Sequence, residues 1–441
     1  MKKVAFHTLG CKVNTYESDA MEQQLRQRGY EIVPFEAGAD VYVINTCSVT
    51  NMADRKSRQM LHRARKMNPE ALIVAAGCYV QAVSPEALKE AGVDLAVGNE
   101  KKGSLADILD RCFADKNTSQ EETVTDIARL HPYEEMELET VTDHTRAFIK
   151  VQDGCNQFCS YCIIPYTRGR VRSRRPEHVT EEIRRLSGQG VKEFVLTGIH
   201  LSSYGTDFTG EGISLLTLIR LVHELPGAER IRLGSLEPRI ITPEWIEAIQ
   251  GLPKICRHFH LSLQSGCDRT LERMNRRYTS GEYLEKCCMI REAFPESAIT
   301  TDVIVGFPGE TEEEFSCTKA FLDKIGFYEM HIFKYSPRKG TRAAKMPEQV
   351  PEQVKTVRSN ELISLEREQS RRFRESFVGR RVSVLLETRE VLDGAAYWVG
   401  HTREYVRAAV PEGPAMGANQ VLEGVPSGFL TEEILLMEDE N

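Results

Sequence analysis

The chain has 441 residues, of which 41% are hydrophobic and 28% charged, and its formal net charge is −8. This length suits two to four domains of ordinary globular composition, and no apolar run reaches the roughly 20 residues of a membrane span. The apolar segment Val4–Phe6 is too short for a secretory signal. We therefore expect a cytoplasmic protein with no membrane partner, whose twelve cysteines are ligands or free thiols rather than disulfides.

Residues 1–113 alternate between apolar strands and helices, which predicts an N-terminal α/β domain with a parallel sheet. Strands are expected at Val4–Thr8, Val41–Asn45 and Leu72–Ala76. Helices are expected near residues 14–28, 51–67, 85–90 and 101–111.

A cysteine follows each of the three predicted strands, and these are Cys11, Cys47 and Cys78. The carboxyl ends of parallel strands form the edge at which open α/β sheets build their sites. Three thiolates at that edge could hold an iron–sulfur cluster with one iron left open. The alternative is that these cysteines are small apolar residues packed at strand ends.

Residues 114–143 interrupt the alternation with nine Asp or Glu residues against two Lys or Arg. This stretch has few large apolar side chains and no clear helical period. We predict a solvated acidic linker here.

A second alternating series covers residues 144–371, with helical segments between apolar strands. The expected strands are Ala147–Val151, Phe194–Leu196, Ile231–Leu233, His258–Leu263, Thr301–Val305 and Met330–Phe333. Six strands separated by helices predict an incomplete (β/α)6 barrel, whose loops at the strand carboxyl ends carry the chemistry.

The loop after the first of these strands contains Cys155, Cys159 and Cys162. This run has no fourth cysteine, so a cubane cluster bound to it would keep one iron open for a ligand that is not protein. A zinc site is one alternative, although zinc usually takes four ligands in paired modules. Buried cysteines without a ligand are the other.

Five arginines follow the cysteine loop within eight residues, and they are Arg168, Arg170, Arg172, Arg174 and Arg175. A charge run is usually a solvated face. In an acidic protein and beside a predicted site, this run instead predicts contact with anions or an RNA phosphate backbone.

The C-terminal residues 374–438 follow a charged helix near residues 351–377 and read as short alternating strands. This spacing predicts a small β-barrel. The basic segment at its entry suits an RNA-binding appendage, and a structural cap is the alternative.

Seven stretches of the chain form a specific combination: His7–Asn14, Asn45–Cys47, Gly77–Cys78, Gly154–Gly169, Leu263–Gly266, Met274–Tyr278 and Thr301–Glu310. With them, the chain resembles the methylthiotransferases, a family of radical S-adenosylmethionine (SAM) enzymes, across essentially its whole length. The resemblance implies an N-terminal three-cysteine domain, a central radical SAM domain and a C-terminal TRAM domain.

The resemblance also implies two [4Fe-4S] clusters, one on Cys11, Cys47 and Cys78 and one on Cys155, Cys159 and Cys162. The second of these would pass an electron into bound SAM, whose 5′-deoxyadenosyl radical removes a hydrogen from carbon 2 of adenine. The other cluster would present a methylated sulfur to that carbon. Candidate SAM contacts at strand ends and in the loop after residue 274 are Thr197, Gly198, Glu237, Gln264, Arg276 and Asp302; structural turns and caps are the alternative for each.

The stretch Leu9–Asn14 resembles the branch that acts on N6-threonylcarbamoyladenosine at position 37 of tRNA. The implied partners are the tRNA anticodon stem-loop and a low-potential electron donor. The same chemistry on N6-isopentenyladenosine or on a ribosomal protein is an alternative. A non-catalytic iron–sulfur protein that binds RNA or transfers electrons is the alternative from another functional class.

Overall fold

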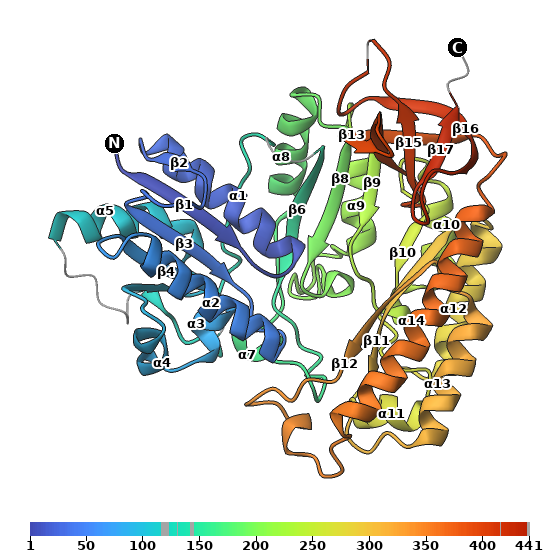
Figure 1. The fold of residues 1–441 in the computed structure, drawn as a ribbon, viewed down its shortest axis with the longest axis horizontal. Helices are drawn as coiled ribbons and strands as arrows, with labels where there is room; N and C mark the ends of the chain where they lie inside the picture. The colour runs from blue at the N-terminus through green and yellow to red at the C-terminus, as the bar shows by residue number, and fades with distance from the viewer. Residues whose placement is uncertain (116–122, 130, 142–144, 415, 439–441) are drawn as a thin grey trace.

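The computed structural model describes residues 1–115, 123–129, 131–141, 145–414 and 416–438. It has three parts, which follow one another along the chain: an N-terminal sheet domain, a central half-barrel and a small C-terminal barrel (Figure 1). Among the described helices, none combines the length and the apolar character needed to cross a membrane.

The N-terminal domain is a five-stranded parallel sheet in the order β2-β1-β3-β4-β5. Its strands are β1 (Lys3–Thr8), β2 (Glu31–Val33), β3 (Val41–Thr46), β4 (Leu72–Gly77) and β5 (Leu95–Val97). Its helices are α1 (Lys12–Gln27), α2 (Asn51–Met67), α3 (Cys78–Ala82), α4 (Pro85–Glu90) and α5 (Leu105–Asp115). The three predicted strands are confirmed. The sequence pattern missed β2 and β5, because three residues are too few to show a strand period.

The central domain contains six parallel strands, as predicted: β6 (Arg146–Asp153), β8 (Glu193–Gly198), β9 (Arg230–Leu233), β10 (His258–His260), β11 (Ala298–Val305) and β12 (Glu329–Lys334). Single bridges, one of them between Ile231 and Ile255, connect β9 to the β10 side. A two-residue strand, β7 (Arg172–Ser173), pairs with the free edge of β6. In the described part of the chain the sheet therefore stays open between β6 and β12.

Helices cover the outer face of this half-barrel (Figure 1). They are α8 (Pro176–Gly188), α9 (Leu215–His223), α10 (Pro243–Gln250), α11 (Asp268–Arg273), α12 (Ser280–Ala293) and α13 (Glu312–Ile325). Hydroxyl side chains begin several of them; for example, Thr311 accepts the backbone N–H of Glu314 at 3.3 Å at the start of α13.

The inner face of the half-barrel is polar. Side chains alternate between the two faces of a strand, and on β9 Ile231 and Leu233 pack into the core beneath the helices. Arg230 and Arg232 therefore point inward. The same alternation places Arg146 and Phe148 of β6, Glu193 of β8, His258 and His260 of β10, and Asp302 of β11 on the inner face. A charged inner face is suited to binding a polar substrate and cannot serve as a packed barrel core.

The C-terminal domain is a closed barrel of five strands in the order β13-β14-β15-β17-β16, as the alternating pattern predicted. Its strands are β13 (Val382–Leu392), β14 (Ala395–Thr402), β15 (Arg407–Pro411), β16 (Val421–Phe429) and β17 (Leu435–Glu438), and α14 (Glu352–Glu375) leads into it. The loop after β14 closes the amino-terminal end of the half-barrel. There Arg232 donates to the carbonyls of Thr402 and Arg403 at 3.2 and 3.1 Å, and the ring of Tyr405 stacks on His258.

The predicted acidic linker packs against the protein, so the expectation of a solvated segment is wrong for its described residues 131–141. Met136 and Leu138 are buried, and the backbone N–H of Leu138 donates to Glu182 of α8 at 2.6 Å. Glu135 and Glu137, which alternate with them, pair with Arg174 and lie partly exposed. Buried and more exposed side chains alternate along this segment with a period of two. The alternation lasts for only a few residues, and the acidic composition conceals it in the sequence. Residues 116–122, 130 and 142–143 of the predicted linker lie outside the described residues.

Candidate functional site

The loop with Cys155, Cys159 and Cys162 lies between β6 and the short helix α7 (Ile164–Thr167), at the carboxyl end of β6. The chain turns into this loop at Gly154, whose φ of +71° and close approach to Arg170 exclude a side chain: a Cβ atom would lie 1.8 Å from the Arg170 carbonyl oxygen. The backbone N–H of Cys155 then donates to the carbonyl of Gly169 at 3.0 Å. The loop is therefore closed at its base by main-chain contacts.

Residues 274–276, which follow α11, hold the other side of the loop. The backbone N–H of Ser160 donates to the carbonyl of Met274, and the Asn275 side chain donates to the carbonyl of Phe158, both at 3.0 Å. Arg276 donates from Nη1 to Sγ of Cys159 at 3.3 Å. A guanidinium therefore lies directly against one of the three sulfurs that would ligate a cluster.

A small cavity of about 130 Å³ opens beside these thiols. All three cysteines line it, together with Glu237, Gln264 and Arg276, three of the six predicted SAM contacts. Thr197, Gly198 and Asp302 do not line it: Thr197 is buried, Gly198 abuts Gln152, and Asp302 lies beside His260. The sequence reasoning missed His200 and Ser262, which also line the cavity; both follow strand ends, which is the one signal that could have identified them.

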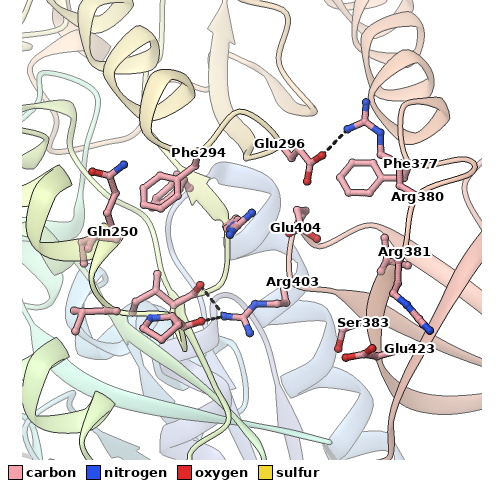
Figure 2. Close-up of a pocket in the computed structure, with 17 residues that line it drawn as sticks. Gln250, Phe294, Glu296, Phe377, Arg380, Arg381, Ser383, Arg403, Glu404 and Glu423 are labelled. Atoms are coloured by element: carbon pink, nitrogen blue, oxygen red, sulfur yellow. Dashed lines mark hydrogen bonds and ion pairs between the residues drawn. The ribbon is translucent and has the colours of Figure 1, made fainter.

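A larger cavity of about 540 Å³ lies at the junction of the central and C-terminal domains (Figure 2). Its lining includes charged side chains, two of which are already engaged by neighbours in the cavity wall. Arg380 pairs with Glu296 at 2.7 Å, and Arg403 points toward the backbone of residues 253–255, where it donates to the carbonyl of Ile255. No cysteine of either triad lines this cavity, so we place the chemistry at the smaller one.

The three cysteines of the N-terminal domain converge as predicted. Cys11 caps α1 after β1, Cys47 follows β3, and Cys78 begins α3 directly after β4. Gly10 permits the approach, because a Cβ atom on it would lie 3.0 Å from Sγ of Cys47. Burial, together with the neighbouring thiols Cys78 and Cys11, raises the pKa of Cys47 to about 11. The three thiols are therefore within electrostatic reach of one another.

Both cysteine triads fit an iron–sulfur cluster better than a single metal ion. Burial, with the neighbouring Cys159 thiol, also raises the pKa of Cys155 to about 11, so crowded thiols of this kind become thiolates only when a cationic centre compensates them. Within the described ranges, the one set of three ligand atoms that all lie within 4.8 Å of each other belongs to His260, Asp302 and His331. In neither triad do all three sulfur atoms lie within 4.8 Å of one another. A zinc ion would require ligand atoms that close, whereas a cubane cluster binds ligands that lie farther apart.

A buried charge network connects the two triads. Glu17 of α1, which is 0% exposed, accepts from Lys150 at 2.7 Å, from Arg168 at 2.8 Å and from Lys102 at 2.5 Å. Arg168 also pairs with Asp153 at 3.0 Å. Burial opposes the charge on Glu17, but the three cations outweigh it and hold its pKa well below the usual range.

Arg168 belongs to the loop after the second triad, and its charge acts on the first. Although burial disfavours its charged form, Asp153, Glu17 and the Cys78 thiol raise its pKa. Its Nη2 donates to Asn14 of α1 at 2.6 Å. One guanidinium thus ties the two cysteine loops together across the domain interface.

The predicted RNA contact is wrong for three of the five arginines. Arg168, Arg172 and Arg174 are buried and pair with carboxylates, namely Glu17 and Asp153, Glu100, and Glu182 respectively. They hold the domain interface because their partners come from distant parts of the chain, which the local sequence does not reveal. Arg170 and Arg175 are exposed; Arg170 lies over the Phe158 ring, and Arg175 pairs with Glu211.

The other six cysteines take no part in either triad. Cys256, Cys267 and Cys287 are buried, Cys112 is half-buried, and Cys288 and Cys317 are exposed; within the described residues none of the six is in a disulfide.

The domains also match known families and folds. Residues 3–98 match the Uncharacterized protein family UPF0004, and residues 149–322 match the Radical SAM superfamily. Among solved structures, the radical SAM methyltransferase TsrM from Kitasatospora setae superposes with a TM-score of 0.56 at 14% identity, over 76% of this chain and 72% of that one. A likeness at this identity establishes the fold alone.

Sequence relatives extend over nearly the whole chain. The threonylcarbamoyladenosine tRNA methylthiotransferase MtaB of Bacillus subtilis is 41% identical over 92% of this chain and 90% of its own length. The MtaB of Aquifex aeolicus is 43% identical over 87% and 92%. The tRNA-2-methylthio-N(6)-dimethylallyladenosine synthase of Acetivibrio thermocellus is 38% identical over 88% and 81%. The chain therefore belongs to the methylthiotransferase family of radical SAM enzymes, and within it to the MtaB-like branch.

Proposed function

We propose that this protein methylthiolates carbon 2 of N6-threonylcarbamoyladenosine at position 37 of tRNA. The observation that carries the proposal is the convergence of two three-thiol sites on one interface, connected by Arg168. A single three-cysteine site would suffice for radical generation. A second one, facing it from another domain, supplies the separate sulfur donor that a methylthiolation needs.

Each triad would hold one [4Fe-4S] cluster, with Cys155, Cys159 and Cys162 at the radical SAM site and Cys11, Cys47 and Cys78 at the sulfur-donor site. When bound, the first cluster with SAM supplies hydrogen abstraction from an unreactive C–H bond, and the second supplies the sulfur. Glu237, Gln264 and Arg276, which line the cavity beside the first triad, would orient SAM there.

The protein itself positions the two sites relative to each other and excludes water from the space between them. The Glu17 network is almost fully buried, so the interface between the two triads is fixed by charge pairs rather than by mobile contacts. Fixed geometry matters because the carbon radical must meet the sulfur before it meets solvent. The open inner face of the half-barrel, with its polar side chains, gives the modified base a place beside both sites.

The remaining partners follow from this chemistry. The anticodon stem-loop would be held by the C-terminal barrel and by the exposed Arg170 and Arg175, because unstacked loop bases suit single-strand recognition. A low-potential electron donor must reduce the radical SAM cluster. A tRNA substrate places the activity in the cytoplasm.

Mass spectrometry of tRNA nucleosides tests the substrate. A deletion strain should lose 2-methylthio-N6-threonylcarbamoyladenosine and regain it when the gene is restored. Unchanged levels of that nucleoside would refute the proposal, and loss of the methylthio derivative of N6-isopentenyladenosine would assign the other tRNA branch. If the deletion strain keeps its methylthio nucleosides but its ribosomal protein lacks the methylthio group, the substrate is the ribosomal protein.

Two cysteine variants separate the roles of the triads. Cys78→Ala should abolish methylthiolation while SAM cleavage to 5′-deoxyadenosine continues under reduction, because the radical site is intact. Cys159→Ala should stop both. Cys288→Ala is the matched control, since Cys288 is exposed on α12 outside either triad. SAM cleavage that survives Cys159→Ala would show that the cluster roles are assigned to the wrong triads.

A further inference from the structure

Lys12 is the first residue of α1 and follows Cys11 directly. Its ammonium lies 5.9 Å from the ring centroid of Phe148, a residue of the inner face of the half-barrel. The side chain is solvent-accessible, and the charged groups near it on the inner face include Arg146, Arg232 and Glu193. Lys12 therefore projects over the inner face and stays in contact with solvent.

No carboxylate satisfies this ammonium. In the described part of the chain, no hydrogen bond or salt bridge to an acidic group reaches Lys12, and the first turn of α1 has no acidic residue. A cation at a helix N-terminus also faces the positive end of the helix dipole. The position is therefore unfavourable for a lysine unless an anion binds there.

The surroundings of Lys12 carry a cation excess. Arg146, Arg230 and Arg232 share the single carboxylate of Glu193, at 3.9, 3.7 and 2.7 Å. Glu387 from the C-terminal barrel pairs with Arg146 at 3.2 Å and also accepts from His401. Asp302 is engaged by His260 at 3.4 Å. Four cations therefore face the two carboxylates Glu193 and Glu387, and Lys12 is the one left without a partner.

We propose that Lys12 binds the carboxylate of the threonylcarbamoyl group on the substrate adenosine, and so selects for that substituent. The inference rests on the proposed function. Carbon 2 of the adenine must lie at the sulfur supplied by the site of Cys11, Cys47 and Cys78, and the N6 nitrogen that carries the substituent is only three bonds from carbon 2. A side chain adjacent to Cys11 is thus placed to reach that substituent. A dimethylallyl group has no charge to offer the ammonium, so the unpaired cation would disfavour it.

The test compares two anticodon stem-loop RNAs, one with N6-threonylcarbamoyladenosine and one with the analogue in which a carboxamide replaces the carboxylate. The cluster-loaded full-length enzyme is assayed for methylthiolated nucleoside, for 5′-deoxyadenosine and for RNA binding. We expect the wild-type enzyme to prefer the carboxylate RNA by roughly tenfold to a hundredfold in kcat/KM, the worth of one hydrogen bond to a charged group. Lys12→Gln should bring this ratio close to one, and Lys12→Arg should restore part of it.

Lys89→Gln, which removes an exposed lysine on α4, is the control and should leave the ratio unchanged. A wild-type enzyme that uses both RNAs equally would overturn the assignment without any variant. A Lys12→Gln enzyme that keeps the wild-type ratio would overturn it too, and would mean that Lys12 serves an RNA phosphate or the cluster, which affect both RNAs alike. If the wild-type enzyme methylthiolates neither RNA while it cleaves SAM, the proposed function itself fails and the inference falls with it.

Discussion

At the scale of single residues, the most consequential side chain outside the cysteines is Glu17. It is fully buried and it accepts from three cations, which leaves Asp153 as the second carboxylate of the network. Removing one partner of a buried ion network leaves charges without compensation, and this costs more than the network itself contributes. The residue therefore controls whether the two domains can pack.

Glu17→Gln is expected to destabilise the protein by about 3–5 kcal/mol, because Lys102 would lose its ion pair and Lys150 and Arg168 would share Asp153. Arg168→Met should cost less, since two cations and two carboxylates remain. Chemical denaturation of the purified protein measures both. Asp107→Asn is the control, because it breaks the exposed pair with Arg28 and should change stability by less than about 1 kcal/mol. A Glu17→Gln protein as stable as the control would show that the network is not what holds the interface.

At the residue scale the sequence identified the two sets of three cysteines, whose role as cluster ligands stays a prediction, and it was wrong for three of the five arginines. Three thiols spaced as Cys155, Cys159 and Cys162 are suited to few roles besides metal or cluster ligation, and Gly154 and Gly10 next to two of the cysteines are required by the backbone. Arg168 looked like a free cation because its partner Glu17 is 151 residues away in sequence. Local sequence reports the type of a side chain but not the distant group that neutralises it.

At the scale of elements, the acidic segment 131–141 shows how a short strip can be mistaken for a linker. Alternation of Met136 and Leu138 with glutamates is a strand-like period, but it lasts for too few residues to outweigh the composition. The long elements were predictable because their periods are sustained: all six strands of the half-barrel overlap their predicted ranges, and the C-terminal residues form the small β-barrel that the pattern predicted. The contact between Tyr405 and the half-barrel was not predictable, since it joins two domains.

Glu134 gives this segment a pH-dependent stability. Its carboxylate accepts the Gly103 N–H at 2.8 Å, and burial raises its pKa to about 7 against the opposing effect of Lys150. Below the unfolded value of 4.5 the group is protonated in both states and contributes nothing. As pH rises from there to about 7, the unfolded state ionises first, so the folded state loses stability. Above about 7 the penalty is constant.

Glu134→Gln should therefore stabilise the protein at pH of about 8 by no more than about 3 kcal/mol, and the gain should shrink as pH falls toward about 5. The amide oxygen can still accept from Gly103. Thermal unfolding across this pH range measures the difference. Glu139→Gln, at an exposed site of the same segment, should give no such trend. A gain that is independent of pH would mean that ionisation of Glu134 is not its cause.

At the scale of the whole molecule, the N-terminal domain is attached on both sides of the opening in the half-barrel. On the β6 side the attachment is the Glu17–Arg168 network. Near the β12 side, Arg338 donates to Ser48 at 2.8 Å and pairs with Asp54, and Asn51 donates to the carbonyl of Pro337 at 2.8 Å. The sheet edge with Cys11, Cys47 and Cys78 is thus held across the opening, facing the loop of the other triad.

Arg338→Met should loosen this second attachment. Arg338 contacts Ser48, which follows Cys47, and its other partners are Asn51 and Asp54, so all six triad cysteines are kept. We expect SAM cleavage to continue while methylthiolated product per 5′-deoxyadenosine falls by about tenfold or more, because a small displacement of the sulfur donor lets the radical be quenched before transfer. Parallel quantification of both products by mass spectrometry gives the ratio. Lys319→Met is the matched control, since its exposed pair with Glu361 joins two outer helices. An unchanged ratio in Arg338→Met would mean that the Glu17–Arg168 network alone fixes the distance between the two sites. The fall in methylthiolated product per 5′-deoxyadenosine should then appear in Glu17→Gln instead.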